Sequence, residues 1–451
     1  MRITTLFIAL MSSVTLLAQP KLNSPYSRFG IGDLNSQYFA NAAGWGGQTA
    51  AFHDPFHLNI ENPASFAFLR TTAFEAGLFS KYSNYQSRNA SQGIWSGNLA
   101  YLALGFTLSS PINEVLDRKK SPWKYGMGLA ITPYSLVGYD VETFDDLPDI
   151  GTVRSNFQGS GGSYRLNWSN AVRHKNTAFG VSLGWLFGKS SYESITSFTD
   201  DPTGELDTFT NIFFQDNFRD DVKMNGFVWK AGFQHDFVLQ TAENDKDTPT
   251  KWITFGVSGE GKHQIKTTAD QFRIRSRGQL SSGQYVDADT FLQVTDVKQH
   301  LTLPATFAIG LQYVKANKFK AGAQFGIESW SGYQNEVRPE TFRNTISISG
   351  GIEYTPDYIS YNRFGKRVRY RIGGYYRQDP RTVNNTNFDD IGLTMGVGLP
   401  LILPRQQTSF INAALEIGKI GTDSPIEETY FKFTLGFTLN DNTWFYKRRF
   451  E

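Results

Sequence analysis

Apolar residues occupy every second position in segments that recur along most of the chain. The clearest segment lies near the carboxyl end, where Phe431, Phe433 and Leu435 alternate with Lys432 and Thr434. Side chains of a strand point alternately to its two faces, so this segment has one apolar face and one polar face. Such strands form either a soluble sandwich or a membrane barrel, and the charge and glycine on the polar faces favour strands with lipid outside and water inside.

The same alternation predicts an all-β fold, a transmembrane antiparallel β-barrel of about fourteen strands, since single-chain bacterial barrels have an even number. Each strand is expected to run for about ten to fifteen residues, long enough to cross a bilayer at a tilt. The predicted strands begin at Thr72, Gly97, Lys124, Gly162, Thr177, Val222, Lys251, Pro304, Lys318, Phe342, Arg367, Asp389, Ser409 and Thr429.

The connections between these segments alternate in length, as in barrels with short periplasmic turns and long external loops. Tight turns are predicted at residues 173–177 and 314–318, and long external loops at about residues 190–221 and 263–303. Both loops carry phenylalanines, which indicates that they pack on themselves or on a ligand.

The amino-terminal segment resembles a secretory signal. Arg2 precedes a short apolar stretch that ends at Ala18-Gln19-Pro20, so cleavage is expected after Ala18. The chain has no cysteine and therefore neither a lipid-attachment thiol nor a disulfide. The chain is therefore expected to consist of a signal peptide (residues 1–18), a segment before the first strand (19–70) and a transmembrane barrel (71–451).

Composition agrees with a membrane barrel and excludes other classes. Aromatic residues make up 15% of the chain and glycine occurs 42 times, which suits lipid-facing surfaces, interfacial girdles and tight bends. The mature chain lacks an apolar run of about 20 residues, so a membrane span must be made of strands. A net charge of +2 argues against a nucleic-acid partner.

The segment before the first predicted strand carries a more specific signal. It contains Ala43-Gly44-Trp45-Gly46-Gly47 and then Asn62-Pro63-Ala64-Ser65. This region resembles the N-terminal hatch of the FadL/TodX family of long-chain fatty acid transporters, which carries an Asn-Pro-Ala motif shortly before its first strand. The stretch around Ser24-Pro25-Tyr26 and the aromatic carboxyl end resemble a branch of that family found in the Bacteroidota.

The resemblance implies a fourteen-stranded monomer whose hatch fills the lumen, and a lateral opening beside a kinked third strand through which hydrophobic molecules pass. In this chain the third predicted strand contains Pro133. Proline lacks the N–H that a continuous ladder uses, so it either kinks the strand there or ends it at Thr132.

Charged residues on the polar faces are expected to point into the lumen. The candidates are Arg165, Arg367, Arg369, Arg371 and Glu416. An arginine could hold a fatty carboxylate with its planar donors. The stronger interpretation is that these charges pair with one another and hold the hatch.

Catalytic and metal chemistry find little support in the sequence. His53 and His57 lie four residues apart, but Pro55 opposes the helix that would bring them together, and no third ligand follows. Ser258 departs from the nucleophile-elbow pattern. No phosphate-binding loop is present. The chain is therefore expected to be no enzyme and to have no metal site and no cofactor.

Two functions follow, both in the outer membrane of a Gram-negative, Bacteroidota-like bacterium. The first is passive uptake of fatty-acid-like hydrophobic molecules, gated by the hatch, with a hydrophobic ligand in the lumen and release into outer-membrane lipid. The alternative is a structural subunit of an envelope complex for secretion or barrel assembly, which implies protein partners. An outward strand face that is plainly polar would mark a partner interface, and none is evident in the sequence.

Overall fold

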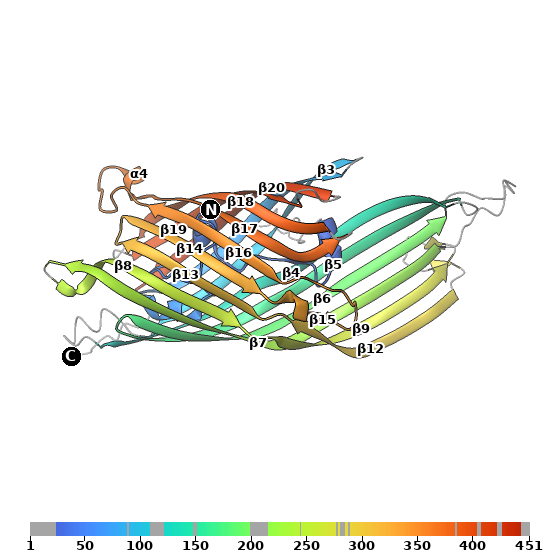
Figure 1. Ribbon diagram of the computed structural model, residues 1–451, viewed down its shortest axis with the longest axis horizontal. Coiled ribbons are helices and arrows are strands. Elements are labelled where there is room, and N and C mark those ends of the chain that lie inside the picture. The colour runs from blue at the N-terminus through green and yellow to red at the C-terminus, as the bar shows by residue number, and fades with distance from the viewer. Residues whose placement is uncertain are drawn as a thin grey trace, which may run out of the picture.

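The protein is described by a computed structural model (Figure 1). The described residues are 24–87, 90–108, 121–147, 151–198, 215–243, 245–276, 278–279, 285–286, 289–383, 386–403, 407–421 and 426–442. The predicted signal peptide and the aromatic carboxyl end lie outside these ranges. None of the helices in these ranges is long and apolar enough to span a bilayer.

The fold is a closed antiparallel barrel of fourteen spanning strands, which confirms the predicted fold class. Twelve of the spanning strands are continuous: β2 (Thr72–Ser87), β3 (Ser91–Thr107), β4 (Trp123–Leu147), β5 (Gly151–His174), β6 (Thr177–Phe198), β7 (Gln215–Ala242), β14 (Phe319–Glu328), β16 (Thr345–Tyr354), β17 (Arg369–Val383), β18 (Thr386–Leu403), β19 (Gln407–Ile420) and β20 (Ile426–Asp441).

Two spanning strands are each made of two pieces. One consists of β8 (Asp245–Glu260) and β9 (His263–Ser276), which both pair with β7. The other consists of β12 (Asp289–Leu303) and β13 (Thr306–Lys315), which pair with β9 and β8 respectively. Pro304 lies in the second break and cannot donate a ladder hydrogen bond, which explains an interruption at this point.

The first and last strands close the barrel. β2 pairs with β20 from Thr72 opposite Asp441 to Ser87 opposite Ile426. Each of the fourteen predicted segments overlaps one spanning strand, and the tight turns at Lys175 and Asn317 lie where predicted, both with positive φ. The alternation of the sequence therefore identified every spanning strand.

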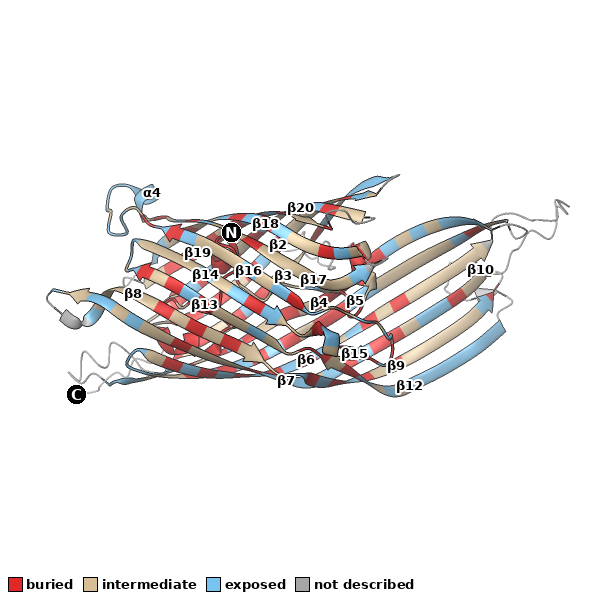
Figure 2. Ribbon diagram, in the orientation of Figure 1, coloured by how far each residue is buried: buried red, intermediate tan, exposed pale blue. Residues whose placement is uncertain are grey.

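The apolar faces point outward, as predicted. Phe433 and Phe437 of β20 are exposed, while Thr434 and Thr438, which each follow one of them, are buried. Exposed and buried positions alternate in this way along the strands of the barrel (Figure 2). The same holds for β6, whose exposed side chains are Phe179, Val181, Leu183, Trp185 and Phe187. The outward surface of the barrel therefore suits a lipid environment.

Strands replace the ends of the first predicted long loop and most of the second, while residues 199–214 of the first lie outside the described residues. β6 continues to Phe198, β7 begins at Gln215, and β9 and β12 occupy most of residues 263–303. With β4 and β5 these strands extend one end of the barrel (Figure 1). Residues of β12 in this extension are exposed on both faces, so their sequence lacks the alternation that lipid imposes (Figure 2).

The segment before β2 lies inside the barrel. It contains η2 (Pro25–Arg28), β1 (Asp33–Leu34), α2 (Ala40–Ala43) and η3 (Pro63–Phe68), and most of its residues from 39 to 69 are buried. Its η3 contacts β5, β6 and β7 on one side of the barrel, and its α2 contacts β18, β19 and β20 on the other. We call residues 24–69 the N-terminal segment.

Inward-facing glycines make room for this segment. A Cβ at Gly180 of β6 would lie 2.3 Å from the carbonyl carbon of Pro63, and one at Gly232 of β7 would lie 2.0 Å from Oδ1 of Asn62. Contacts this short are impossible for real side chains, so the wall and the N-terminal segment can meet only where the wall is bare backbone.

Gly180→Ala should therefore destabilise the protein by about 1–3 kcal/mol, the usual cost of overpacking. The control is Gly374→Ala on β17, where a new Cβ would make ordinary contacts of 3.4 Å. The measurement is the temperature at which the barrel unfolds, which appears in detergent gels as the loss of the fast-migrating folded band. Equal unfolding temperatures for the two variants would contradict the close packing of the N-terminal segment against Gly180.

Candidate functional site

The Asn62-Pro63-Ala64 motif forms the start of η3. Asn62 caps the helix by accepting a hydrogen bond from the N–H of Ala64 at 3.1 Å, and Pro63 occupies the first turn, where a missing N–H costs nothing. The side-chain amide of Asn62 also lies within 3.2 Å of the carbonyl oxygens of Phe233 in β7 and Val257 in β8. The motif thus caps a helix and fixes it to the wall at once.

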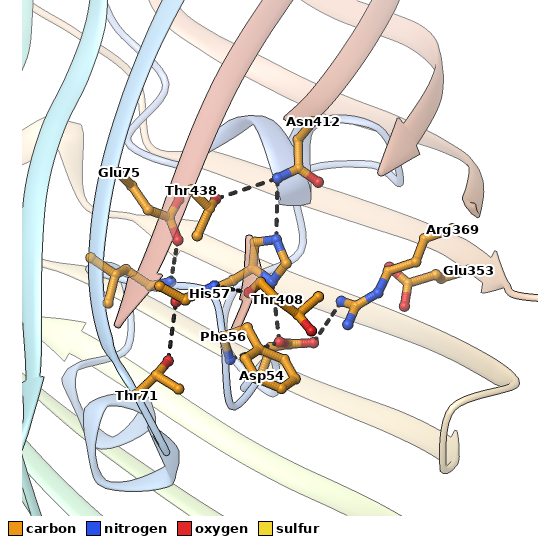
Figure 3. Close-up of polar contacts among 12 residues, drawn as sticks. Asp54, Phe56, His57, Thr71, Glu75, Glu353, Arg369, Thr408, Asn412 and Thr438 are labelled. Carbon is orange, nitrogen blue, oxygen red and sulfur yellow. Dashed lines mark hydrogen bonds and ion pairs between the residues drawn. The ribbon is translucent and has the colours of Figure 1, made fainter. Parts of the chain in front are cut away.

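A closed polar ring joins the N-terminal segment to four strands of the wall, and Figure 3 shows the part of it around Asp54, His57 and Asn412. Lys320 of β14 bridges Asp54 at 3.0 Å and Glu353 of β16 at 3.2 Å. Glu353 accepts from Arg371 of β17 at 2.7 Å. Arg371 donates to Asn412 of β19 at 2.9 Å, which brings the ring back toward the N-terminal segment.

His57 completes the polar ring as a neutral side chain. Its Nδ1 donates to Asp54 at 3.1 Å and its Nε2 accepts from Asn412 at 3.1 Å, which fixes the tautomer. Burial lowers the pKa of His57 to about 4, against the opposing effect of Asp54. Burial alone would raise the pKa of Asp54, but Arg369 and Lys320 hold it well below its usual range.

Two further polar pairs join the N-terminal segment to β7. His53 contacts Asp236 of β7 at 3.0 Å, and Lys230 of β7 donates to Glu61 at 2.8 Å. Buried charges are costly unless they are paired and hydrogen-bonded, so these contacts fix where the segment can lie. His53 and His57 therefore have structural partners, and no group of three metal-binding side chains occurs among the described residues.

A cavity of about 410 Å³ remains between the N-terminal segment and the wall. Its lining is rich in charge, and the charged side chains are Asp33, Glu61, Lys81, Arg165, Lys230, Glu260, Glu328, Arg377, Asp379, Arg381, Asp390, Glu416, Glu428 and Lys432. Many of them pair within the lining, as Arg165 does with Glu260 at 2.6 Å and Lys81 with Glu428 at 2.5 Å. Apolar side chains such as Ile31, Trp330 and Phe342 also line the cavity, so charged and apolar surface lie side by side in it.

The third spanning strand departs from its neighbour near Pro133. β3 and β4 pair only from Leu102 opposite Ile131 to Thr107 opposite Gly126, and the ladder between β4 and β5 shifts register between Pro133 and Ser135. β4 nevertheless continues to Leu147, so the alternative that the strand ends at Thr132 is wrong. We call the parting of β3 and β4 the seam.

The N-terminal segment covers the edge of β4 that the seam exposes. β1 pairs with Leu136 and Ser135, the N–H of Asn35 donates to the carbonyl of Tyr134 at 2.9 Å, and that of Ser24 donates to Gly138 at 2.7 Å. Residues 91–101 of β3 pair only with β2 in the described part of the chain.

Four of the five predicted lumen charges lie in the interior. Arg165 pairs with Glu260, Arg369 with Asp54 and Arg371 with Glu353, while Glu416 pairs with Lys432 at 3.2 Å. Arg367 does not belong with them, because β17 begins two residues later and Arg367 lies in the short helix α4 (Phe364–Arg367). Its alternation with Arg369 and Arg371 in the sequence was misleading.

Sequence reasoning missed Asp54, Lys320 and Asn412. Asp54 stands between two histidines that were considered only as metal ligands, and a carboxylate beside them was the available signal. Nothing local marks Lys320 or Asn412 as its neighbours, because strand register alone brings them together.

Asp54→Asn should loosen the N-terminal segment, because it leaves Arg369 buried without its carboxylate and Lys320 with Glu353 alone, a loss that typically costs about 3–5 kcal/mol. The readout is the labelling rate of a cysteine placed at Ala42, which is buried in the segment. The control is Glu142→Gln in the exposed pair with Arg154, where about 0–1 kcal/mol is expected. Equal labelling rates in both variants would refute the role of the polar ring.

The segment should also release more readily as the pH falls from 6.5 toward 4. The folded pKa of His57 lies below its ordinary value of 6.5, so in this window the released state binds a proton that the docked state does not. The docked state of the N-terminal segment is therefore most stable above pH 6.5 and loses stability as the pH falls from 6.5 toward 4. His57→Gln, labelled at the same Ala42→Cys position, should show a weaker pH dependence, and an unchanged slope would contradict this assignment.

Comparison with solved structures finds the same barrel fold in a FadL homologue and in two toluene transporters. A FadL homologue from Pseudomonas aeruginosa matches at a TM-score of 0.55 with 13% identity, over 89% of this chain and 98% of that one. The toluene transporter TodX from P. putida matches at 0.53 with 14% identity, over 90% and 99%. The Ralstonia pickettii toluene transporter TbuX matches at 0.50 with 14% identity, over 90% and 99%.

At these identities the likeness shows a FadL-like barrel fold and no more. Sequence comparison with curated proteins finds no match. A protein-family model named BamG matches residues 1–451, the whole length of the sequence. The chain therefore belongs to the BamG family.

Proposed function

We propose that this protein is a structural subunit of an outer-membrane protein complex, with the barrel-assembly machinery as the candidate complex, and that it uses a FadL-like barrel as a scaffold. The whole-chain match to the BamG model favours this candidate over a free channel. The observation that carries the proposal is the interior, which the N-terminal segment occupies and where buried pairs of Asp54, Glu61 and His53 with the wall hold it.

The interior argues for a scaffold because of what hydrophobic transport requires. A fatty chain gains about 0.8 kcal/mol for each methylene that leaves water for an apolar wall. In this interior, charged side chains interrupt the apolar parts of the cavity wall, and opening the lumen would first break the contacts of Asp54, Glu61 and His53 with the barrel. A barrel closed in this way keeps its outer surface, its extension and its turns available to partners.

The proposal predicts stable partners at native expression levels. The chain, tagged on the chromosome and purified in a mild detergent, should appear in native mass spectrometry as one complex with other envelope proteins in fixed stoichiometry. The Gly374→Ala variant serves as a folded control and should keep the same complex. Recovery of the chain as a monomer would overturn the proposal.

The second candidate is a passive channel for hydrophobic molecules, and the seam favours it. The parting of β3 and β4 at Pro133 lies on the third spanning strand, where the resemblance to the FadL/TodX family implies a lateral exit. Two of the similar structures are titled toluene transporters. Uptake of a labelled fatty acid or of toluene by vesicles that contain the purified chain alone would support this candidate and displace the first.

A further inference from the structure

The connection between β16 and β17 displays large apolar side chains to solvent. Tyr361 is 96% exposed and Ile359 is 72% exposed, and Tyr358 and Phe364 are also exposed. The connection spans residues 355–368 and includes α4. It lies at the barrel end that carries the tight turns around Lys175 and Asn317. It is much longer than those turns, which have only two or three residues between strands. We call residues 355–368 the rim loop.

The rim loop is held in one shape by its own hydrogen bonds. The N–H of Asp357 donates to the carbonyl of Lys366 at 2.8 Å, which closes the loop across its base. The Asp357 carboxylate accepts from the N–H of Ile359 at 3.2 Å, and Ser360 donates to the Asp357 carbonyl at 3.3 Å. The exposure of its aromatic side chains is therefore built into the loop, and a large exposed apolar surface usually marks a contact site.

The rim loop folds toward the outside of the wall. Tyr370 of β17 points outward, because Arg369 and Arg371 on either side of it pair inside the barrel. Its hydroxyl donates to the carbonyl of Gly365 at 3.0 Å, so α4 lies against the outer rim (Figure 1). Tyr354 at the end of β16 is also exposed beside it. Exposed tyrosines at a strand end are typical of the aromatic girdle at a membrane surface.

Cations accompany the aromatic residues. Arg363, Lys366 and Arg367 have no carboxylate partner among the described residues, and the one acid of the loop, Asp357, is used within it. Arg367 lies 5.3 Å from the ring of Phe364, and its Nε is buried without a hydrogen-bond partner. Lysine and arginine with tyrosine and phenylalanine form the usual composition of segments that lie in a lipid headgroup layer.

We infer that the rim loop is an interfacial anchor that inserts its aromatic side chains into the phospholipid headgroup layer of the leaflet at this end of the barrel, with phosphate groups bound by Arg363, Lys366 and Arg367. The outward fold of α4, its position beside the girdle tyrosines and the unpaired cations all favour lipid over a protein occupant. The inference stands independently of the proposed function.

The absence of cysteine from the chain permits a clean test. A nitroxide label is attached at Tyr361→Cys in the full chain, reconstituted in vesicles of phosphatidylethanolamine and phosphatidylglycerol. Asn176→Cys in the β5–β6 turn is the aqueous reference, and Phe433→Cys on the outward face of β20 is the lipid reference. Collision of the label with oxygen, which concentrates in lipid, is compared with collision with a water-soluble nickel chelate.

The label at residue 361 should show an oxygen-to-nickel ratio between those of the two references. Combined Arg363→Gln, Lys366→Gln and Arg367→Gln substitutions should shift this ratio toward that of residue 176, and the shift should be small in vesicles of phosphatidylcholine alone. A ratio equal to that of residue 176 in the unsubstituted loop overturns the inference. A label shielded from both reagents only when other proteins copurify also overturns it, in favour of a protein contact.

Discussion

The rest of the structure depends on closure of the sheet between β2 and β20. Within a bilayer a backbone N–H or C=O without a partner costs several kcal/mol, so a sheet can span it only when its first and last strands pair. This ladder runs the full length of β2, from Thr72 to Ser87. Closure by fourteen strands creates a lumen, and the polar faces that avoid lipid must then find partners inside it. The N-terminal segment supplies those partners, which is why residues 39–69 are almost entirely buried although they belong to no spanning strand.

The way the interior is filled determines what it can do. Bare glycine backbone admits the segment to close contact, and the polar ring then fixes its position through Asp54 and His57. Buried ion pairs add little net stability, but removal of one partner is expensive, so the polar ring specifies one location for the segment. What remains open is a cavity of about 410 Å³ with charged and apolar lining, and its ion pairs already satisfy many of its charged groups. The fixed position of the segment is the physical basis on which we propose a scaffold.

The sequence predicts the part of the fold that contacts lipid, because lipid requires apolar residues at alternate positions. It does not predict the parts that lie outside the bilayer or inside the lumen. Every spanning strand appears in the alternation, because each outward position inside the bilayer must be apolar. The extension of β6, β7, β9 and β12 was predicted as loops, since strands with water on both faces have no such pattern. Arg367 was assigned to the lumen because alternation continues by chance two residues before β17 begins. The polar ring could not be found, because its residues at positions 54, 320, 353, 371 and 412 meet only through the register of strands distant in the sequence.

The seam shows why the N-terminal segment acts as part of the wall. Where β4 leaves β3, the freed backbone of β4 bonds to β1, Asn35 and Ser24. Withdrawal of residues 24–35 would leave those carbonyl and N–H groups unpaired at the very place where a lateral exit would open. In the FadL-like arrangement, an exit for hydrocarbon and the integrity of the sheet are therefore coupled through one segment. That coupling opposes repeated opening, since each opening would expose backbone polar groups as well as break buried ion pairs.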